Sequence, residues 1–283
     1  LTSSLVKLAM GFSIERSLPT VQFTSLEKWF ERYAQKNSQD SFKNGFVYLL
    51  ADEFTNHNEV PLGQKTVKLL NQLGYGVRIP RGIVTGRSFI SKGMLIEAKA
   101  LANANVVQLA DIISNEQPLI GIEPSALLTF RDEIPSLVDA EKRGQAEKLK
   151  PNCLLIDEFI AREFKAGKIS ASSFHGKQQK ILLHGHCHQK SIAGLTSTRI
   201  ALTIPSQYEV ELLPTGCCGM AGSFGYEKKH YNISQQIANL VLFPRLLTKP
   251  IKSIIASNGT SCRHQIKDGI EQTGYHTAEI LFN

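Results

Sequence analysis

The chain has 283 residues, a formal net charge of +7, 42% apolar residues and 20% charged residues. This length suits roughly two domains of about 150 residues each, and the composition is ordinary for a folded globular protein. No apolar run reaches the roughly 18 residues that a membrane-spanning helix needs. The first residue is Leu1 and the start lacks the pattern of a signal peptide, so we expect a piece of a longer chain.

The positive charge is scattered, and its densest stretch, residues 141–150, also carries glutamates. That mixture is typical of a solvated helix face, so we expect no nucleic-acid partner. The five cysteines are an odd number and include an adjacent pair, which argues against a disulfide framework. Free thiols fit a reducing compartment. We therefore expect the protein in the cytoplasm, either free or peripheral at the inner face of the membrane.

Residues 1–45 are predicted to form a helical lead-in, in which Ser25 can cap a helix with Leu26 and Trp29 on its apolar face. From residue 46 the pattern changes to continuous apolar runs, which are typical of strands buried on both faces of a parallel sheet. Three strand–loop–helix units follow in residues 46–140. Their strands are expected at 46–51, 76–80 and 118–122, and their helices at 61–73, 92–103 and 124–138.

Residues 141–179 are charged and are predicted to be a helical linker. Cys153 lies there in the apolar run 153–156, which we interpret as a buried helical face with a plain core thiol. The strand–loop–helix pattern then starts again in residues 180–283. Its strands are expected at 180–183, 208–213 and 251–256, and its helices at 191–201, at 233–247 and after residue 262. The predicted fold class is α/β, with two pseudo-repeated, doubly wound parallel-sheet domains of the Rossmann-like kind.

The other four cysteines fall in loops that follow the strands of the second repeat: Cys187, Cys217, Cys218 and Cys262. The carboxyl ends of parallel strands share one edge of an open α/β sheet, and ligands bind at that edge. An adjacent cysteine pair flanked by Gly216 and Gly219 is a poor choice for a core. It can, however, bring two thiolates and a bare backbone close to one centre. We therefore expect a metal centre at this edge.

The two halves align without gaps around these loops. The first half carries other residues at the four cysteine positions, in the same order: Phe54, Val84, Thr85 and Ala126. The first repeat has thus lost every cysteine ligand, and we predict one metal centre per chain.

Four thiolates from three loops suit a [4Fe–4S] cluster, in which each iron takes one sulfur ligand. Glycines let backbone N–H groups approach such a cluster, and the histidines beside the cysteines could donate hydrogen bonds or serve as occasional ligands. The candidates around the four ligands are His184, His186, His188, Gly216, Gly219, Gly222, Arg263 and His264. No catalytic residue is predicted.

Two alternatives stay open. Four cysteines also make a closed zinc site, which would give a structural zinc-binding docking module, although zinc sites usually use CxxC pairs and the sequence has none. The other alternative is a thiol–disulfide redox domain in which Cys217 and Cys218 react as free thiols.

Three stretches of the sequence resemble the cysteine-rich CCG domain: residues 184–190, 216–225 and 259–265. This domain occurs in the B subunit of heterodisulfide reductase, in the C subunit of anaerobic glycerol-3-phosphate dehydrogenase, and in the C-terminal region of large FAD-linked oxidases of the D-lactate (2-hydroxyacid) dehydrogenase type. The resemblance covers about residues 5–283. It implies an iron–sulfur electron-transfer module of an FAD-linked oxidoreductase, which relays electrons from the flavin part to an acceptor.

The resemblance also implies upstream FAD-binding and ferredoxin-like domains or subunits as partners, with FAD bound only there. The sequence has no FAD motif and no ferredoxin-type cysteine run, so we expect a part of an oxidoreductase that is not catalytically complete alone. It departs from the family pattern in its cysteine-free first repeat and in Gly259, which stands where a final CxxC would begin. These departures favour a four-cysteine cluster over a five-cysteine noncubane one.

Overall fold

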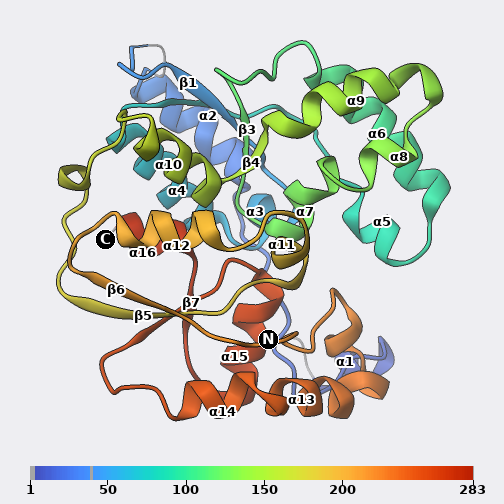
Figure 1. The fold of residues 1–283 in the computed structure, drawn as a ribbon. Coiled ribbons are helices and arrows are strands. Elements are labelled where there is room, and N and C mark those ends of the chain that lie inside the picture. The colour runs from blue at the N-terminus through green and yellow to red at the C-terminus, as the bar shows by residue number, and fades with distance from the viewer. Residues whose placement is uncertain (1–3, 39–40, 283) are drawn as a thin grey trace.

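The computed structural model describes residues 4–38 and 41–282. Residues 1–3 and 39–40 of the predicted lead-in, and residue 283, lie outside the described residues. The chain folds around two four-stranded parallel sheets with the same internal order, β2-β1-β3-β4 and β6-β5-β7-β8 (Figure 1). The predicted α/β class with two doubly wound parallel sheets is confirmed, and the shared strand order agrees with an internal repeat.

The first sheet consists of β1 (Phe46–Leu49), β2 (Gly76–Arg78), β3 (Leu119–Gly121) and β4 (Cys153–Leu155). The helices that precede or surround it are α1 (Ser4–Ala9), α2 (Leu26–Lys36), α3 (Glu53–His57), α4 (Val60–Gln72), α5 (Arg87–Ser91), α6 (Leu95–Leu109), α7 (Pro124–Leu127), α8 (Ile134–Leu137), α9 (Arg143–Leu149) and α10 (Ile156–Lys165). Val47, Leu49 and Ile120 are fully buried, as expected for apolar strands covered on both faces.

The second sheet consists of β5 (Gln179–Leu183), β6 (Tyr208–Leu212), β7 (Ile254–Ala256) and β8 (Gly274–Tyr275). Its helices are α11 (Cys187–Ile192), α12 (Thr196–Thr203), α13 (Tyr231–Leu240), α14 (Leu242–Leu247), α15 (Thr260–Ile270) and α16 (Thr277–Phe282). Short 3-10 turns lie at Leu128–Phe130, Ala140–Lys142, Lys150–Asn152, Ala171–Ser173, Phe224–Tyr226 and Lys228–His230.

The segment 141–179 differs from the predicted helical linker, because it contains β4. This strand pairs with β3 in parallel and completes the first sheet. Cys153 is the first residue of β4, so the interpretation of a helical face was wrong. The thiol is nevertheless fully buried in the core, as expected, and it donates to the carbonyl of Leu149 at 3.5 Å.

Two predicted helices of the second half are each divided. The helix expected at 191–201 is replaced by α11 and α12, which are separated by Gly194 with a φ of 71°. The helix expected at 233–247 breaks between α13 and α14 at Val241. Pro244 explains this break, because a proline ring clashes with the carbonyl four residues earlier in a continuous helix.

The lead-in contacts both halves of the molecule. The predicted cap is present, since the Ser25 hydroxyl accepts a hydrogen bond from the Lys28 N–H at 3.3 Å, and α2 packs against α4. Farther upstream, Phe12 forms an antiparallel bridge with Glu227 of the second half. The lead-in therefore packs against both domains.

Helices of the two halves pack directly on each other. α10 packs on α12 and α16 packs on α4, and one apolar core includes β1 residues such as Val47 together with Ile181 of β5. In Figure 1 these helices lie between the two sheets. Within residues 4–38 and 41–282, no helix combines the length and hydrophobicity required to cross a bilayer.

Candidate metal centre

Three loops at the carboxyl edge of the second sheet carry the four cysteines. Cys187 is the first residue of α11, after β5, and Cys262 is the third residue of α15, after β7. Cys217 and Cys218 lie in the loop that follows β6. The strand order places β5 between β6 and β7, so all three loops start from neighbouring strands.

The four thiols form a continuous series of sulfur contacts. Cys187 hydrogen-bonds to Cys217, and Cys217 to Cys218. The sulfurs of Cys218 and Cys262 are 3.3 Å apart. Cys218 and Cys262 are 3% and 1% exposed, whereas Cys187 is half-buried and Cys217 is exposed. The group thus has a buried end and a solvent-facing end.

The thiols influence one another's ionisation. Hydrogen bonds from Cys187 and Cys218 lower the pKa of Cys217, to which the N–H of Gly219 also donates at 3.2 Å. Hydrogen bonding with Cys218 likewise lowers the pKa of Cys262, and the pKa values of Cys187 and Cys218 are raised in return. Ligand thiols must lose their protons to bind a metal, so binding would release protons chiefly from Cys187 and Cys218, whose pKa values are raised.

His184 is the histidine nearest to the buried sulfurs. It is fully buried, and a nitrogen of its ring lies within 4.8 Å of the sulfurs of Cys218 and Cys262. Its Nδ1 is 2.6 Å from the hydroxyl of Thr215, and a hydrogen bond between the ring and the Cys262 thiol helps to lower the pKa of that thiol. A histidine held at one ring nitrogen, with the ring beside sulfurs, is typical of a metal ligand or a donor to one.

The other predicted histidines have separate environments. His186 is the N-cap residue of α11, and its ring packs against Gly259, where an added Cβ would lie 2.4 Å from Cδ2. His188 approaches Asp132 of the first half at 3.5 Å, and burial lowers its pKa. His264 accepts or donates a hydrogen bond at Nδ1 with the Tyr226 hydroxyl, 3.0 Å away.

The glycines of the predicted motif differ in what they require. Gly219 has a φ of 92°, and a Cβ there would lie 2.3 Å from the carbonyl oxygen of Ser234 in α13. Gly222 also has a positive φ, of 65°. A Cβ on Gly216 or Gly222 would meet no atom of the described chain within 4 Å. Gly219 is thus needed for packing, whereas Gly216 leaves open space beside the cysteines.

Lys190 fixes the cysteine-pair loop to α11, and no pattern in the sequence indicated this role. Its ammonium group donates to the carbonyls of Thr215 and Gly216 at 2.8 and 2.9 Å. The two loops that carry Cys187 and the adjacent pair are therefore tied together by a charged hydrogen-bond donor.

Arg263 faces the first repeat and not the sulfurs. Its guanidinium group bonds both carboxylate oxygens of Glu59, at 2.5 and 2.6 Å. Glu123 accepts from the backbone N–H of Thr260 at 2.8 Å. Neither Glu59 nor Glu123 was predicted from the sequence to lie near the centre. The alignment of the two halves contains one indication, because it places Glu123 at the position of Gly259.

Arg16 of the lead-in was also missed. It is fully buried and donates to the carbonyl of Gly225 at 2.8 Å and to the hydroxyl of Ser234 at 3.0 Å. The loop after the cysteine pair therefore depends on a residue about 200 positions earlier in the sequence.

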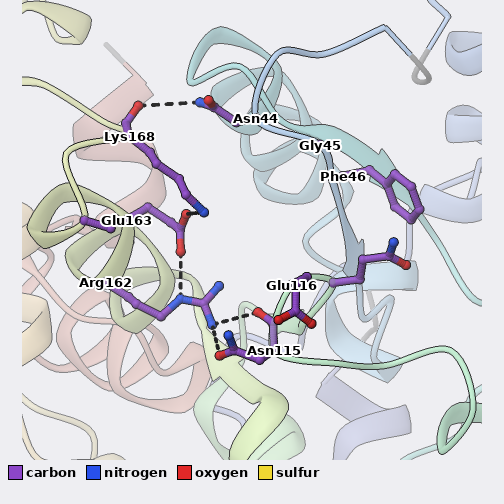
Figure 2. A pocket seen from close by; sticks show the side chains of 10 residues that line it. Asn44, Gly45, Phe46, Asn115, Glu116, Arg162, Glu163 and Lys168 are labelled. Carbon is purple, nitrogen blue, oxygen red and sulfur yellow. Dashed lines mark hydrogen bonds and ion pairs between the residues drawn. The ribbon is translucent and has the colours of Figure 1, made fainter.

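A cavity of about 520 Å³ lies away from this centre, at the opposite edge of the first sheet. Figure 2 shows its lining, in which Glu163 bonds the side chains of Arg162 and Lys168. Arg162 also donates to Asn115, so the charged groups of this cavity are paired with one another. None of the described residues that line it is a cysteine.

No protein-family model matches the chain. The sequence is similar to the C subunit of anaerobic glycerol-3-phosphate dehydrogenase from Escherichia coli (strain K12), with 24% identity over 279 residues, which cover 98% of this chain and 68% of that protein. It is also similar to the D-2-hydroxyglutarate dehydrogenases of Pantoea ananatis and Escherichia coli (strain K12). Each is 27% identical, over 222 and 237 residues, which cover 78% and 83% of this chain. The chain spans only 21% and 22% of those two proteins.

The relatives are dehydrogenases or dehydrogenase subunits, and one of them is a protein in which the CCG domain was expected. The chain is therefore similar, over most of its length, to the C subunit of anaerobic glycerol-3-phosphate dehydrogenase and to the D-2-hydroxyglutarate dehydrogenases, which agrees with the resemblance of its CCG-like motifs to those of oxidoreductases.

Proposed function

We propose that the chain is the iron–sulfur electron-transfer module of an FAD-linked oxidoreductase of the D-lactate (2-hydroxyacid) dehydrogenase type. In this proposal Cys187, Cys217, Cys218 and Cys262 hold one [4Fe–4S] cluster. The observation that carries the proposal is the convergence of these four thiols, from three loops, at one edge of one sheet. The similarity to dehydrogenases supports an oxidoreductase role.

The chemistry of the donor set fits such a cluster. Four sulfurs within one continuous group can each supply the ligand that an iron needs. The ring of His184, which hydrogen-bonds to the Cys262 thiol, and the N–H of Gly219 lie beside these sulfurs and favour a group that carries negative charge. The cluster would supply transfer of single electrons.

The protein's own residues would hold and insulate this centre. Lys190 keeps the cysteine-pair loop next to α11, and Arg16 holds the following loop to α13. Cys218 and Cys262 exclude water from the inner side, whereas the exposed Cys217 marks the side at which electrons enter or leave. The partners in this proposal are upstream FAD-binding and ferredoxin-like parts and an electron acceptor, in the cytoplasm, where thiols stay reduced.

A closed zinc site is the second candidate, and one observation favours it. Two sulfurs on one tetrahedral zinc ion lie about 3.8 Å apart, because each zinc–sulfur bond is about 2.3 Å long. The 3.3 Å separation of Cys218 and Cys262, with His184 beside them, comes close to that spacing. Such a site would make the chain a docking module without redox chemistry.

Substitution of single cysteines tests the proposal. The chain is purified without oxygen and reconstituted with iron and sulfide, and its iron, sulfide and zinc contents are measured. We expect about four irons and four sulfides per chain. Cys217→Ser should remove most of both. Cys153→Ser is the matched control, because this cysteine lies in the first sheet and should leave the iron content unchanged.

The opposite results would reject the iron–sulfur assignment. Stoichiometric zinc in the isolated protein, with no sulfide after reconstitution, would identify the docking module. Protein that takes up neither metal, and in which Cys217 reacts rapidly with disulfides, would identify a thiol redox domain.

A further inference from the structure

Two carboxylates of the first half, which has no cysteine at the candidate ligand positions, reach across to the helix that carries Cys262. Glu59 is the N-cap residue of α4, and Glu123 is the N-cap residue of α7, directly after β3. Both carboxylates contact the first turn of α15 in the second half. The carboxyl edges of the two sheets therefore meet at this turn.

These contacts surround Cys262 on both sides in the sequence. Thr260, two residues before it, donates its backbone N–H to Glu123 at 2.8 Å and its hydroxyl to Glu59 at 2.6 Å. Arg263, one residue after it, donates from Nη2 to both carboxylate oxygens of Glu59, at 2.5 and 2.6 Å. The other nitrogen of Arg263 donates to the carbonyls of Ser257 and Asn258 at 2.9 and 2.6 Å. Glu59 thus holds the first turn of α15 directly and, through Arg263, the loop that precedes this helix.

The arrangement has the properties of a rigid support. The side chains of Arg263 and Glu59 are only 9% and 18% exposed. Hydrogen bonds between charged groups are shorter and roughly twice as strong as those between neutral groups. Removal of one partner leaves a buried charge uncompensated, so the pair resists rearrangement. A second buried acid, Asp157, accepts from Gln189 and Asn258 at 3.0 and 2.9 Å and joins α11 to the same loop.

We infer that Glu59 and Glu123 are positioning residues for the metal centre, so that the first half holds Cys262 at the distance the other three cysteines require. This inference rests on the proposed function, because it gives Cys262 the role of a ligand. It assigns a role to a repeat that has no cysteine ligands of its own. It also accounts for Arg263, whose charge is directed to Glu59 and not to the sulfurs.

The test compares Glu59→Gln with Glu163→Gln in the 283-residue chain. Glu163 is also a largely buried first-half carboxylate paired with an arginine, but it lies in the cavity of Figure 2, at the other edge of the sheet. Each substitution removes one negative charge from a largely buried ion pair, and Glu163 has Lys168 and the Tyr75 hydroxyl as further partners. Loss of general stability should therefore affect both variants, and loss of positioning should affect Glu59→Gln alone.

Three readouts separate the two roles. Glu59→Gln should lose iron and sulfide to a chelator about tenfold more readily, as is usual when a ligand's support is removed. Its midpoint potential should rise, because the unpaired charge of Arg263 stabilises the reduced cluster. In the metal-free protein, iodoacetamide should label Cys262 several times faster, as measured by mass spectrometry of its peptide. Glu163→Gln should match the parent protein in all three.

Equal behaviour of the two variants would overturn the inference. If Glu59→Gln does not fold, Glu123→Gln replaces it, since that change keeps the Glu59–Arg263 ion pair and weakens the hydrogen bonds that Glu123 accepts from Thr260 and Ser125. If the parent chain binds no iron and sulfide, the proposed function fails, but the labelling of Cys262 still decides whether these carboxylates position it.

Discussion

At the level of single residues, corresponding positions in the two halves differ in whether they offer a metal ligand. Ala126 and Cys262 are each the third residue of the helix that follows the third strand of their sheet. Phe54 and Cys187 each lie in the first helix after the first strand. Alanine and phenylalanine provide no ligand atom, so the same backbone plan can bind a metal in one half and serve as support in the other.

Asp52 gives a prediction about pH at this level. It is fully buried at the N-cap of α3 and accepts hydrogen bonds from the N–H groups of Phe54 and Thr55. Burial raises its pKa from 3.8 to about 7. The folded state therefore holds a proton that the unfolded state releases, and stability falls as pH rises from about 4 to 7. Ionisation of Asp52 would lower the free energy of unfolding by on the order of 4 kcal/mol over this range, because each pKa unit corresponds to about 1.4 kcal/mol.

Asp52→Asn keeps an acceptor oxygen for the cap and removes the ionisation. We expect the variant to be more stable than the parent at pH 7 and to lose less stability between about pH 4 and 7. Urea titrations at several pH values measure the free energy of unfolding. Asp111→Asn, at an exposed position, is the control and should keep the parent's slope. If the unfolding free energy of Asp52→Asn depends on pH as it does in the parent, the Asp52 carboxyl is ionised over the whole range from about pH 4 to 7.

At the level of elements, the loop after β6 is shaped by its contact with α13. Gly219 adopts a φ of 92° that favours glycine, and its Cα faces the carbonyl oxygen of Ser234. Gly225 also packs closely, because a Cβ there would lie 2.6 Å from the sulfur of Met220 and 2.8 Å from the hydroxyl of Ser234 in α13. The position of the cysteine pair is therefore set by backbone packing as well as by Lys190.

Gly219→Ala should separate this loop from α13. The added methyl group combines a left-handed backbone with a contact of 2.3 Å, and we expect the free energy of unfolding to fall by about 1–3 kcal/mol. Iron retention should fall with it. Gly216→Ala is the matched control in the same motif, because its methyl group would meet no described atom within 4 Å. In the metal-free protein it should leave stability near that of the parent; comparable losses in both variants would contradict this account of the loop.

At the level of the whole molecule, the two halves form one structure in which each contributes to the centre. The apolar core contains residues of β1 and β5, and acids of the first half hold α15 of the second. The half without cysteines at the candidate ligand positions is thus in contact with the half that has them. In the proposed function, the metal centre depends on the packing of both sheets.

Much of this architecture follows from local patterns in the sequence. Apolar runs predicted six of the eight strands found in the described part of the chain. The four candidate ligand cysteines each follow a strand in the sequence, which predicted their place at the carboxyl edge of the sheet. β4 was missed because its three residues, Cys153–Leu155, lie in a charged stretch and are as short as an apolar turn of a helix. β8 has only two residues and depends on pairing with β7.

Contacts between distant residues could not be predicted in this way. Glu59 and Arg263 are 204 positions apart, and Arg16 and Gly225 are 209 apart. No periodicity connects such pairs, because they meet only after both sheets have formed and packed. Local patterns also placed Arg263 and His264 near the centre by sequence proximity, whereas helix α15 directs Arg263 toward Glu59 and His264 toward Tyr226.

In the proposed function, each chain holds one redox-active cluster, in the second half only. The most direct measurement is electron paramagnetic resonance of the reconstituted chain during stepwise chemical reduction and reoxidation. We predict one signal that appears on reduction, titrates with a single midpoint potential, disappears on reoxidation and is absent in Cys217→Ser. A protein that contains stoichiometric zinc and shows no signal at any potential would contradict the account.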